Sequence, residues 1–277
     1  GTTGCVGGAV VGAAVSPGRG MRILRPGVIS IFGGSAPASV TTTSAVVSPR
    51  PLVMVTRSPP RRGLRVAVAH LGADERARAF GAETGLPAYE WDAADEDACA
   101  EGVARVVRDL GPLAVRVNNA GVDADVPFHE MSRADWDAVV AVDLGSMFHL
   151  CRPVIGDMRE RGYGRIVDIS SVNAQEGQLG RTKDCDAKAA VIGVTRALAS
   201  ESARHGITVN AIGPGYADTP MVQAMPDDIR RRIVAQVPLG RLAEPWEIGR
   251  GVAFLASEDA GLVTGATPPV DGGLYMR

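Results

Sequence analysis

Acidic residues are missing from the first quarter of this 277-residue chain. Residues 1–73 contain no Asp or Glu and eight Arg, a net charge of +8, whereas residues 74–277 hold all 31 acidic residues against 21 basic ones. The overall net charge of −2 and the isoelectric point near 6.1 therefore average two unlike parts. Neither value supports a nucleic-acid partner or a membrane-surface partner.

Cysteine is scarce and scattered. The four cysteines, Cys5, Cys99, Cys151 and Cys185, form no CxxC pair and have no disulfide-framework spacing. This usage predicts reduced, packing cysteines in a cytoplasmic protein and no metal site. The sequence also has no apolar run of the roughly 18 residues that a spanning helix needs, so we expect no membrane segment.

Residues 1–64 are rich in Gly, Ala, Ser, Thr, Val and Pro and show only weak periodicity. An acid-free leader with Arg and Ser is typical of a transit peptide. We favour another interpretation, in which this segment is upstream or out-of-frame coding sequence translated as protein. Arg outnumbers Lys 27 to 2, which indicates GC-rich DNA, and such DNA read in a shifted frame encodes segments rich in Arg, Pro, Ser and Ala. We therefore divide the chain into an atypical segment 1–64 and a domain 65–277.

Strands and helices alternate from residue 65 onward. The apolar patterns predict strands at 65–70, 87–91, 113–117, 165–170 and 207–212, and helices at 73–84, 96–110, 132–160 and 184–204. Ser132-Arg-Ala-Asp135 is typical of a capping box at a helix start. This order, in a chain long enough to bury one large core, predicts a single α/β domain with a Rossmann-type, doubly wound parallel sheet.

Short motifs follow several of the predicted strands. Asn118-Asn-Ala-Gly121 ends the strand 113–117, where small residues let a flat cofactor approach the backbone. Ser171 follows the next strand, and Lys188 lies seventeen residues further on. Gly213-Pro-Gly-Tyr-Ala-Asp-Thr219 follows the strand 207–212, and Val270-Asp-Gly-Gly273 lies near the chain end. Singly, Ser171 is typical of a strand-end cap and Lys188 of a solvated helix lysine, but their joint spacing favours a catalytic role.

Together these motifs resemble the short-chain dehydrogenase/reductase family, and within it the acetoacetyl-CoA and 3-oxoacyl-ACP reductases, over about residues 64–277. The stretches 82–92 and 164–173 are especially similar to the acetoacetyl-CoA group. The resemblance implies NADPH-dependent reduction of a 3-oxoacyl thioester, such as acetoacetyl-CoA, to the 3-hydroxyacyl product. It also implies a homotetramer.

The resemblance further implies roles for individual residues. Ser171 would hydrogen-bond the substrate carbonyl, and Lys188 would bind the nicotinamide ribose. The other expected cofactor contacts are Asp92, Asn119, Ala120, Gly121, Pro214, Gly215 and Thr219. Gln178 and Tyr216 resemble substrate-side residues. The strand ending at His70 is followed by no Asp or Glu that could hold a ribose 2′-hydroxyl, which favours NADP(H) over NAD(H).

The first departure from the family is Asp184, which occupies the tyrosine position of Tyr-x-x-x-Lys. A carboxylate is shorter than a phenol, and Lys188, one helical turn away, favours its ionised form. We therefore expect no proton to be available near pH 7, and losing a positioned acid typically lowers the rate by about 10²–10⁴-fold. A water between Asp184 and the substrate would recover part of that loss, either for the thioester or for some other ketone.

The second departure is Asp143, which occupies an asparagine position. An amide both donates and accepts hydrogen bonds whereas a carboxylate only accepts, so a water relay at this position would be rewired. These departures predict an impaired reductase, or alternatively a non-catalytic remnant or partner subunit of a reductase.

The third departure is the missing phosphate loop, Thr-Gly-x-x-x-Gly-x-Gly after the first strand. Residues 51–56 resemble that strand, but the eight residues 57–64 include two prolines and cannot hold a crossover helix. A second alignment uses 27–32 as the strand, 33–39 as the loop and 40–47 as a poor, β-branched helix. We assign neither alignment, and we place no phosphate-loop residue in the site.

Overall fold

The computed structural model describes residues 28–31, 40–43, 52–57, 64–72, 81–82, 84–122 and 125–276. Residues 73–80 and 83 of the predicted helix 73–84 and most of segment 1–64 lie outside these residues, whereas 81, 82 and 84 are helical. The main sheet has the strand order β5-β4-β3-β6-β7-β8-β9. In that order the strands are Ala88–Glu90, Leu64–His70, Leu52–Arg57, Leu113–Asn118, Gly164–Ile169, Ile207–Pro214 and Pro269–Val270.

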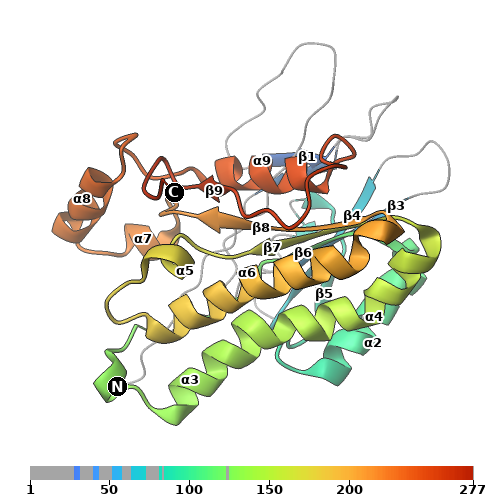
Figure 1. Cartoon of the computed structure of the whole chain (residues 1–277), viewed down its shortest axis with the longest axis horizontal. Helices are drawn as coiled ribbons and strands as arrows, with labels where there is room; N and C mark the ends of the chain where they lie inside the picture. The colour runs from blue at the N-terminus through green and yellow to red at the C-terminus, as the bar shows by residue number, and fades with distance from the viewer. Residues whose placement is uncertain are drawn as a thin grey trace.

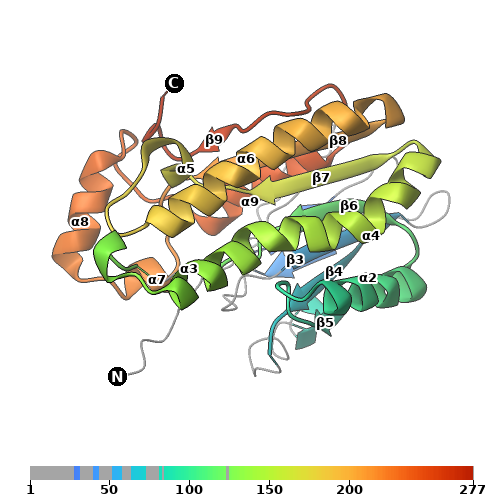
Figure 2. The same cartoon turned by 60° about the horizontal axis from the view of Figure 1, so that its bottom comes forward.

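Helices cover both faces of this sheet. Helices α2 (Glu96–Leu110), α4 (Ser146–Arg161) and α6 (Thr182–Ser202) lie across one face, and α9 (Pro245–Ala256) lies on the other (Figure 1, Figure 2). The shorter helices are η1 (Phe128–Glu130), α3 (Arg133–Val139), η2 (Val140–Gly145), α5 (Asn173–Glu176), η3 (Ala203–His205), α7 (Pro220–Gln223) and α8 (Asp227–Gln236). The predicted α/β fold of Rossmann type is confirmed.

The sheet separates two hydrophobic cores. Along β4, Ala67 and Ala69 belong to the core beneath α2 and α4, whereas Val66 and Val68 belong to the core beneath α9. All residues of β6 and β7 are buried, as expected for parallel strands that are covered on both faces. The strand ends therefore hold fixed positions at one edge of the sheet.

One central strand runs against the others. β3 pairs antiparallel with β4 and with β6, whereas β4–β5, β6–β7, β7–β8 and β8–β9 are parallel pairs. Only residues 58–63 separate β3 from β4, and a parallel crossover needs a dozen or more residues. The antiparallel pairing of β3 and β4 needs no crossover helix, and residues 58–63 themselves lie outside the described residues. The reversed direction of β3 follows from the same short connection and was not among the expectations.

A separate two-stranded sheet consists of β1 (Val28–Ile31) and β2 (Val40–Thr43), which pair antiparallel. The second alignment of the phosphate loop requires a helix at 40–47, and that expectation is wrong for residues 40–43. The sequence Val-Thr-Thr-Thr is β-branched throughout, which favours a strand over a helix.

The helix that leads to the site begins at the predicted capping box. Ser132 Oγ accepts a hydrogen bond from Asp135 N at 3.1 Å, and Ser132 N donates to Asp135 Oδ2 at 3.0 Å. The helical stretch 133–161 then contains a π-helical turn, η2, which the apolar pattern does not predict. By length and composition the stretch could cross a membrane. We interpret it as a core helix, because its buried Leu150 and Val154 pack in the core with α2.

Candidate active site

A cavity of about 130 Å³ lies at the carboxyl edge of β6, β7 and β8. Its lining comes from the residues that follow these strands, from the start of α6 and from the segment around α7 and α9. The lining residues are Asn119, Ile169, Ser170, Ser171, Val172, Asn173, Arg181, Asp184, Lys188, Pro214, Gly215, Tyr216, Ala217, Thr219, Val222, Met225 and Ile248. The structure thus brings Ser171, Asp184 and Lys188 to one cavity at the edge where open α/β sheets bind ligands.

Ser171 and Ser170 have different partners at the end of β7. Ser171 Oγ accepts a hydrogen bond from Asn173 N at 3.2 Å and is half-buried in the cavity lining. Ser170 Oγ donates to the backbone oxygen of Lys188 at 2.8 Å, which ties α6 to the sheet. The Ser171 hydroxyl keeps its own proton as a donor, since its contact with the backbone of Asn173 uses it as an acceptor.

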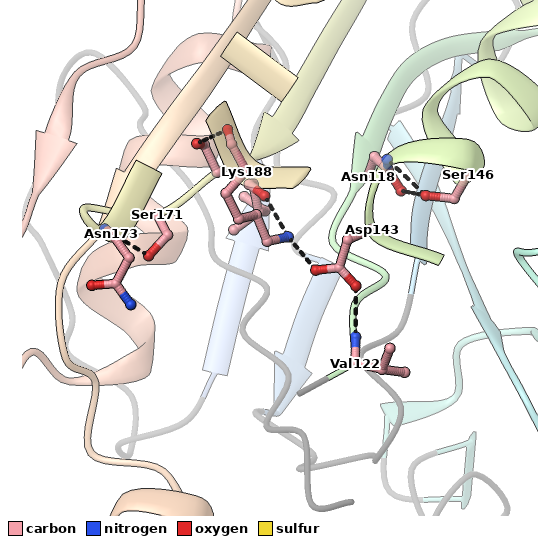
Figure 3. A network of polar contacts seen from close by, with 9 residues as sticks. Asn118, Val122, Asp143, Ser146, Ser171, Asn173 and Lys188 are labelled. Atoms are coloured by element: carbon pink, nitrogen blue, oxygen red, sulfur yellow. Dashed lines mark hydrogen bonds and ion pairs between the residues drawn. The ribbon is translucent and has the colours of Figure 1, made fainter. Parts of the chain in front are cut away.

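Lys188 is held in the protein interior by two oxygens (Figure 3). Its Nζ donates to the backbone oxygen of Ile169 at 3.1 Å and lies 3.0 Å from Asp143 Oδ2. The contact with Asp143 is an ion pair whose angles fall outside hydrogen-bond geometry. The two side chains are 2% and 1% exposed, so the pair is almost completely removed from water.

Asp143 owes its position to the π-helical turn η2. Its Oδ1 accepts a hydrogen bond from Val122 N at 2.8 Å, just after β6, while Oδ2 faces Lys188 (Figure 3). The side chain at the asparagine position of the family is thus a carboxylate close to the site. It contacts the lysine directly, so both carboxylate oxygens are engaged by protein groups.

Asp184 lies in the first turn of α6 and is 6% exposed. It lines the cavity together with Lys188, which is one helical turn further along the same helix. The tyrosine position of the family pattern is thus inside the cavity, and a short acidic side chain occupies it.

The predicted substrate-side residues form a hydrogen-bonded chain. Gln178 Oε1 accepts from Asn173 Nδ2 at 2.7 Å, and Gln178 Nε2 donates to the Tyr216 hydroxyl at 2.9 Å. Asn173 and Tyr216 line the cavity, whereas Gln178 lies behind them and contacts both. The contact fixes the tyrosine ring beside the end of β8.

The predicted cofactor residues divide into two groups. Asn119, Pro214, Gly215 and Thr219 line the cavity, whereas Ala120, Gly121 and Asp92 do not. Asp92 follows β5, and its Oδ1 accepts a hydrogen bond from Ala94 N at 2.8 Å. A Cβ on Gly215 would lie 2.8 Å from the Cα of Asp271, so glycine is needed for the close approach of β8 to the C-terminal segment.

Arg181 is a cavity residue that the sequence motifs did not indicate. It lines the cavity and forms a two-point ion pair with Asp125, with Nε 2.9 Å from Oδ1 and Nη2 donating to Oδ2 at 3.1 Å. Its spacing of three residues before Asp184 was the available signal, because residues at i and i+3 share a helix face.

A second buried ion pair lies inside the sheet behind the site. Arg116 Nη1 is 3.5 Å from Asp168 Oδ1 and donates to Cys151 Sγ at 2.7 Å, while its Nε and Nη2 have no hydrogen-bond partner within the described residues. Burial raises the pKa of Asp168 to about 6, although Arg116 acts in the opposite direction. Burial also raises the pKa of the Cys151 thiol to about 11. The described cysteines are free, as predicted.

The sequence matches a protein-family model and several known proteins. The family model described as enoyl-(acyl carrier protein) reductase matches residues 55–275. The chain is 50% identical over 215 residues to an acetoacetyl-CoA reductase of Rhizobium meliloti, covering 77% of this chain and 89% of that protein. It is 51% identical over 188 residues to nodulation protein G of Azospirillum brasilense, covering 68% and 76%. It is 40% identical over 172 residues to a 3-oxoacyl-[acyl-carrier-protein] reductase of Haemophilus influenzae, covering 62% and 71%.

Proposed function

The chain belongs to the short-chain dehydrogenase/reductase family, and on that premise we propose that it reduces a 3-oxoacyl thioester, acetoacetyl-CoA or a close analogue, to the 3-hydroxyacyl thioester. The observation that carries the proposal is the shared cavity of Ser171, Lys188 and the residue at the tyrosine position. The names of the similar proteins support the substrate class. We further propose a homotetramer in the cytoplasm.

Carbonyl reduction needs a hydrogen-bond donor to the carbonyl oxygen and a source of a proton, and Ser171 and Asp184 together supply only the first. Ser171 can donate a hydrogen bond to the substrate carbonyl oxygen and so polarise the carbon that receives hydride. The oxygen then needs a proton, and an ionised Asp184 cannot supply one. A water next to Asp184 would have to deliver it, so the proposed reaction is slow.

A nicotinamide cofactor supplies the hydride when bound, and the residues fit its two halves differently. The residues that line the cavity suit the nicotinamide and its ribose, and they include Asn119, Lys188, Gly215 and Thr219. The pyrophosphate half fits poorly, because the loop that normally receives it follows the first strand at the carboxyl edge. With β3 reversed, the loop after β3 leaves from the opposite edge. We propose NADP(H) over NAD(H), because no acidic residue directly follows His70.

The reversed strand leads to a prediction about affinity. We expect NADPH to bind less than about tenfold more tightly than reduced nicotinamide mononucleotide. Hydrogen bonds to charged groups contribute about 1.5–3 kcal/mol each, and about 1.4 kcal/mol is tenfold in affinity, so an intact phosphate loop would separate the two ligands much further. Fluorescence titration of both nucleotides measures the ratio. A ratio above about 100 would contradict the inference that the protein binds the pyrophosphate half of the cofactor poorly.

The activity is tested by following NADPH oxidation with acetoacetyl-CoA. We expect slow turnover that disappears in Ser171→Ala, because the carbonyl loses its hydrogen-bond donor. Asp186→Asn is the matched control, since Asp186 is exposed on the same helix and should leave the rate unchanged. Turnover that is indifferent to Ser171→Ala would place the chemistry elsewhere.

A second candidate is a non-catalytic remnant or partner subunit of a reductase. It is favoured by the capture of Lys188 by Asp143, which occupies the lysine with a protein carboxylate. This candidate predicts no NADPH oxidation by the wild type under any condition in which an intact relative turns over. It also predicts that mixing with an intact relative gives a mixed oligomer.

A further inference from the structure

Tyr216 is the phenol among the described residues that line the cavity. It lies just after β8 and is half-buried, and its backbone oxygen accepts a hydrogen bond from Ala243 N at 2.9 Å. The backbone oxygen of Pro214 accepts from Val172 N at 2.9 Å, which joins the end of β8 to the segment that carries Ser171. The tyrosine ring is therefore attached to a well-anchored part of the cavity wall.

A chain of hydrogen bonds that all run in one direction ends at the Tyr216 hydroxyl. Asn173 Nδ2 donates to Gln178 Oε1 at 2.7 Å, and Gln178 Nε2 donates to Tyr216 Oη at 2.9 Å. The phenol oxygen is an acceptor in this chain, so its own proton remains to be donated, and no group in the described part of the chain accepts it. The amide N–H of Gln178 would also stabilise negative charge on the phenol oxygen once that proton has left.

The chemistry of Tyr216 matches what the cavity lacks at position 184. A phenol is a stronger acid than the serine and threonine hydroxyls that line the same cavity. Tyr216 therefore brings the functional group of the family pattern into the cavity from the end of β8, whereas the family pattern places it in the first turn of α6.

We propose that Tyr216 is the proton source of the reduction, and that its proton reaches the carbonyl oxygen through the water next to Asp184. This inference rests on the proposed function. A buried water needs two to four polar partners, and this one would accept from the Tyr216 hydroxyl and donate to the Asp184 carboxylate and to the carbonyl oxygen. A carboxylate accepts up to about four hydrogen bonds, so Asp184 can hold the water in addition to its contact within the protein.

The proton and electron balance of this step is complete. The carbonyl carbon accepts hydride from the reduced nicotinamide, which is thereby oxidised, and the C=O π electrons move onto the oxygen. The water gives one proton to that oxygen and receives one from Tyr216, so the products are the 3-hydroxyacyl thioester and a phenolate. Tyr216 is half-buried, and its phenolate takes up a proton from solvent after product release.

The proposal is tested by removing the Tyr216 hydroxyl in two backgrounds. In the otherwise unchanged chain, Tyr216→Phe keeps the ring, and we expect kcat for acetoacetyl-CoA to fall by at least about tenfold with a much smaller change in KM, because a positioned acid acts on the chemical step. In the Asp184→Tyr background the new phenol supplies the proton, so most of this loss should disappear. A residue that only positions the substrate would cost the same factor in both backgrounds.

Tyr89→Phe is the matched control, because the Tyr89 hydroxyl donates to Asp109 on α2 and the residue does not line the cavity. Its kcat should equal that of the wild type. An unchanged kcat in Tyr216→Phe, or equal losses in both backgrounds, would overturn the relay and leave the proposed function in place. Turnover only in chains that carry Asp184→Tyr would also overturn the relay, because the wild type would then have no proton source. No turnover in any of these chains would contradict the proposed function itself, and the relay with it.

Discussion

Replacing Asp184 with tyrosine should raise the turnover number for acetoacetyl-CoA by about 10²–10⁴-fold, the usual contribution of a positioned general acid. Asp184 already lines the cavity and is 6% exposed, so the added ring would extend into the space where the carbonyl has to sit. Lys188, one turn away, would favour the ionised phenol and so make the hydroxyl a better proton donor.

The size of the gain should fall toward the lower end of that range. The ammonium of Lys188 is already 3.0 Å from Asp143, and a paired cation perturbs a nearby phenol less than an unpaired one does. Steady-state kinetics with saturating NADPH measure the change. The matched control is Asp184→Phe, which places the same ring in the cavity without the hydroxyl. Equal rates for the two variants, or no gain with tyrosine, would show that the missing acid is not what limits this chain.

The parts of the fold that follow from local pattern were predictable. Helix α2 begins and ends where the spacing of Val103, Val106, Val107 and Leu110 places it. Strands β6, β7 and β8 lie within one or two residues of their predicted ranges, because each is a short apolar run that ends at a small or polar residue. With the strand ends known, the cavity position of Ser171 follows from the rule for parallel sheets.

The contacts that decide the charge of the site were not predictable in this way. Asp143 pairs with Lys188 across 45 positions of sequence and depends on a π-helical turn with no recognised local signal. Arg181 pairs with Asp125 across 56 positions. A one-dimensional pattern identifies charged residues but does not say which of them are neutralised by a distant partner. The reversal of β3 differs from these contacts, because the short 58–63 connection that causes it is evident in the sequence, and strand direction could have been predicted from its length.

The buried pair of Arg116 and Asp168 should be a net cost to the fold, and removing both charges should stabilise the protein. Each side chain is 1% exposed, two guanidinium nitrogens have no hydrogen-bond partner within the described residues, and the ion-pair distance is long at 3.5 Å. Replacing such a pair with apolar or neutral residues is often neutral or stabilising by about 1–4 kcal/mol, whereas removing one partner typically costs about 3–5 kcal/mol.

We therefore expect Arg116→Met to lower the free energy of unfolding by about 3–5 kcal/mol near pH 7.5, because an unpaired carboxylate stays in the core. The double variant Arg116→Met/Asp168→Asn should recover this loss and exceed the wild type. Urea denaturation measures both. Arg133→Met is the control, since the Arg133–Asp137 pair is 85% and 53% exposed and should contribute less than about 1 kcal/mol.

The pH dependence of the stability of these variants is a second, independent test of whether the buried pair destabilises the fold. The pKa of Asp168 is about 6 in the folded protein, mainly through burial, against about 3.9 in an unfolded chain. Between these values the folded state binds the extra proton, so this group's contribution to stability is present below pH 4 and is lost as the pH rises through 6. The advantage of the double variant over the wild type should accordingly grow from pH 4 to pH 6 and stay constant above it. The stability deficit of Arg116→Met should shrink on acidification, because the carboxyl of Asp168 can then take up a proton.

A double variant that is less stable than Arg116→Met at pH 7.5 would mean that the Asp168 carboxylate stabilises the core through its other contacts, of which Thr195 Oγ1 at 3.5 Å from Oδ2 is the nearest candidate.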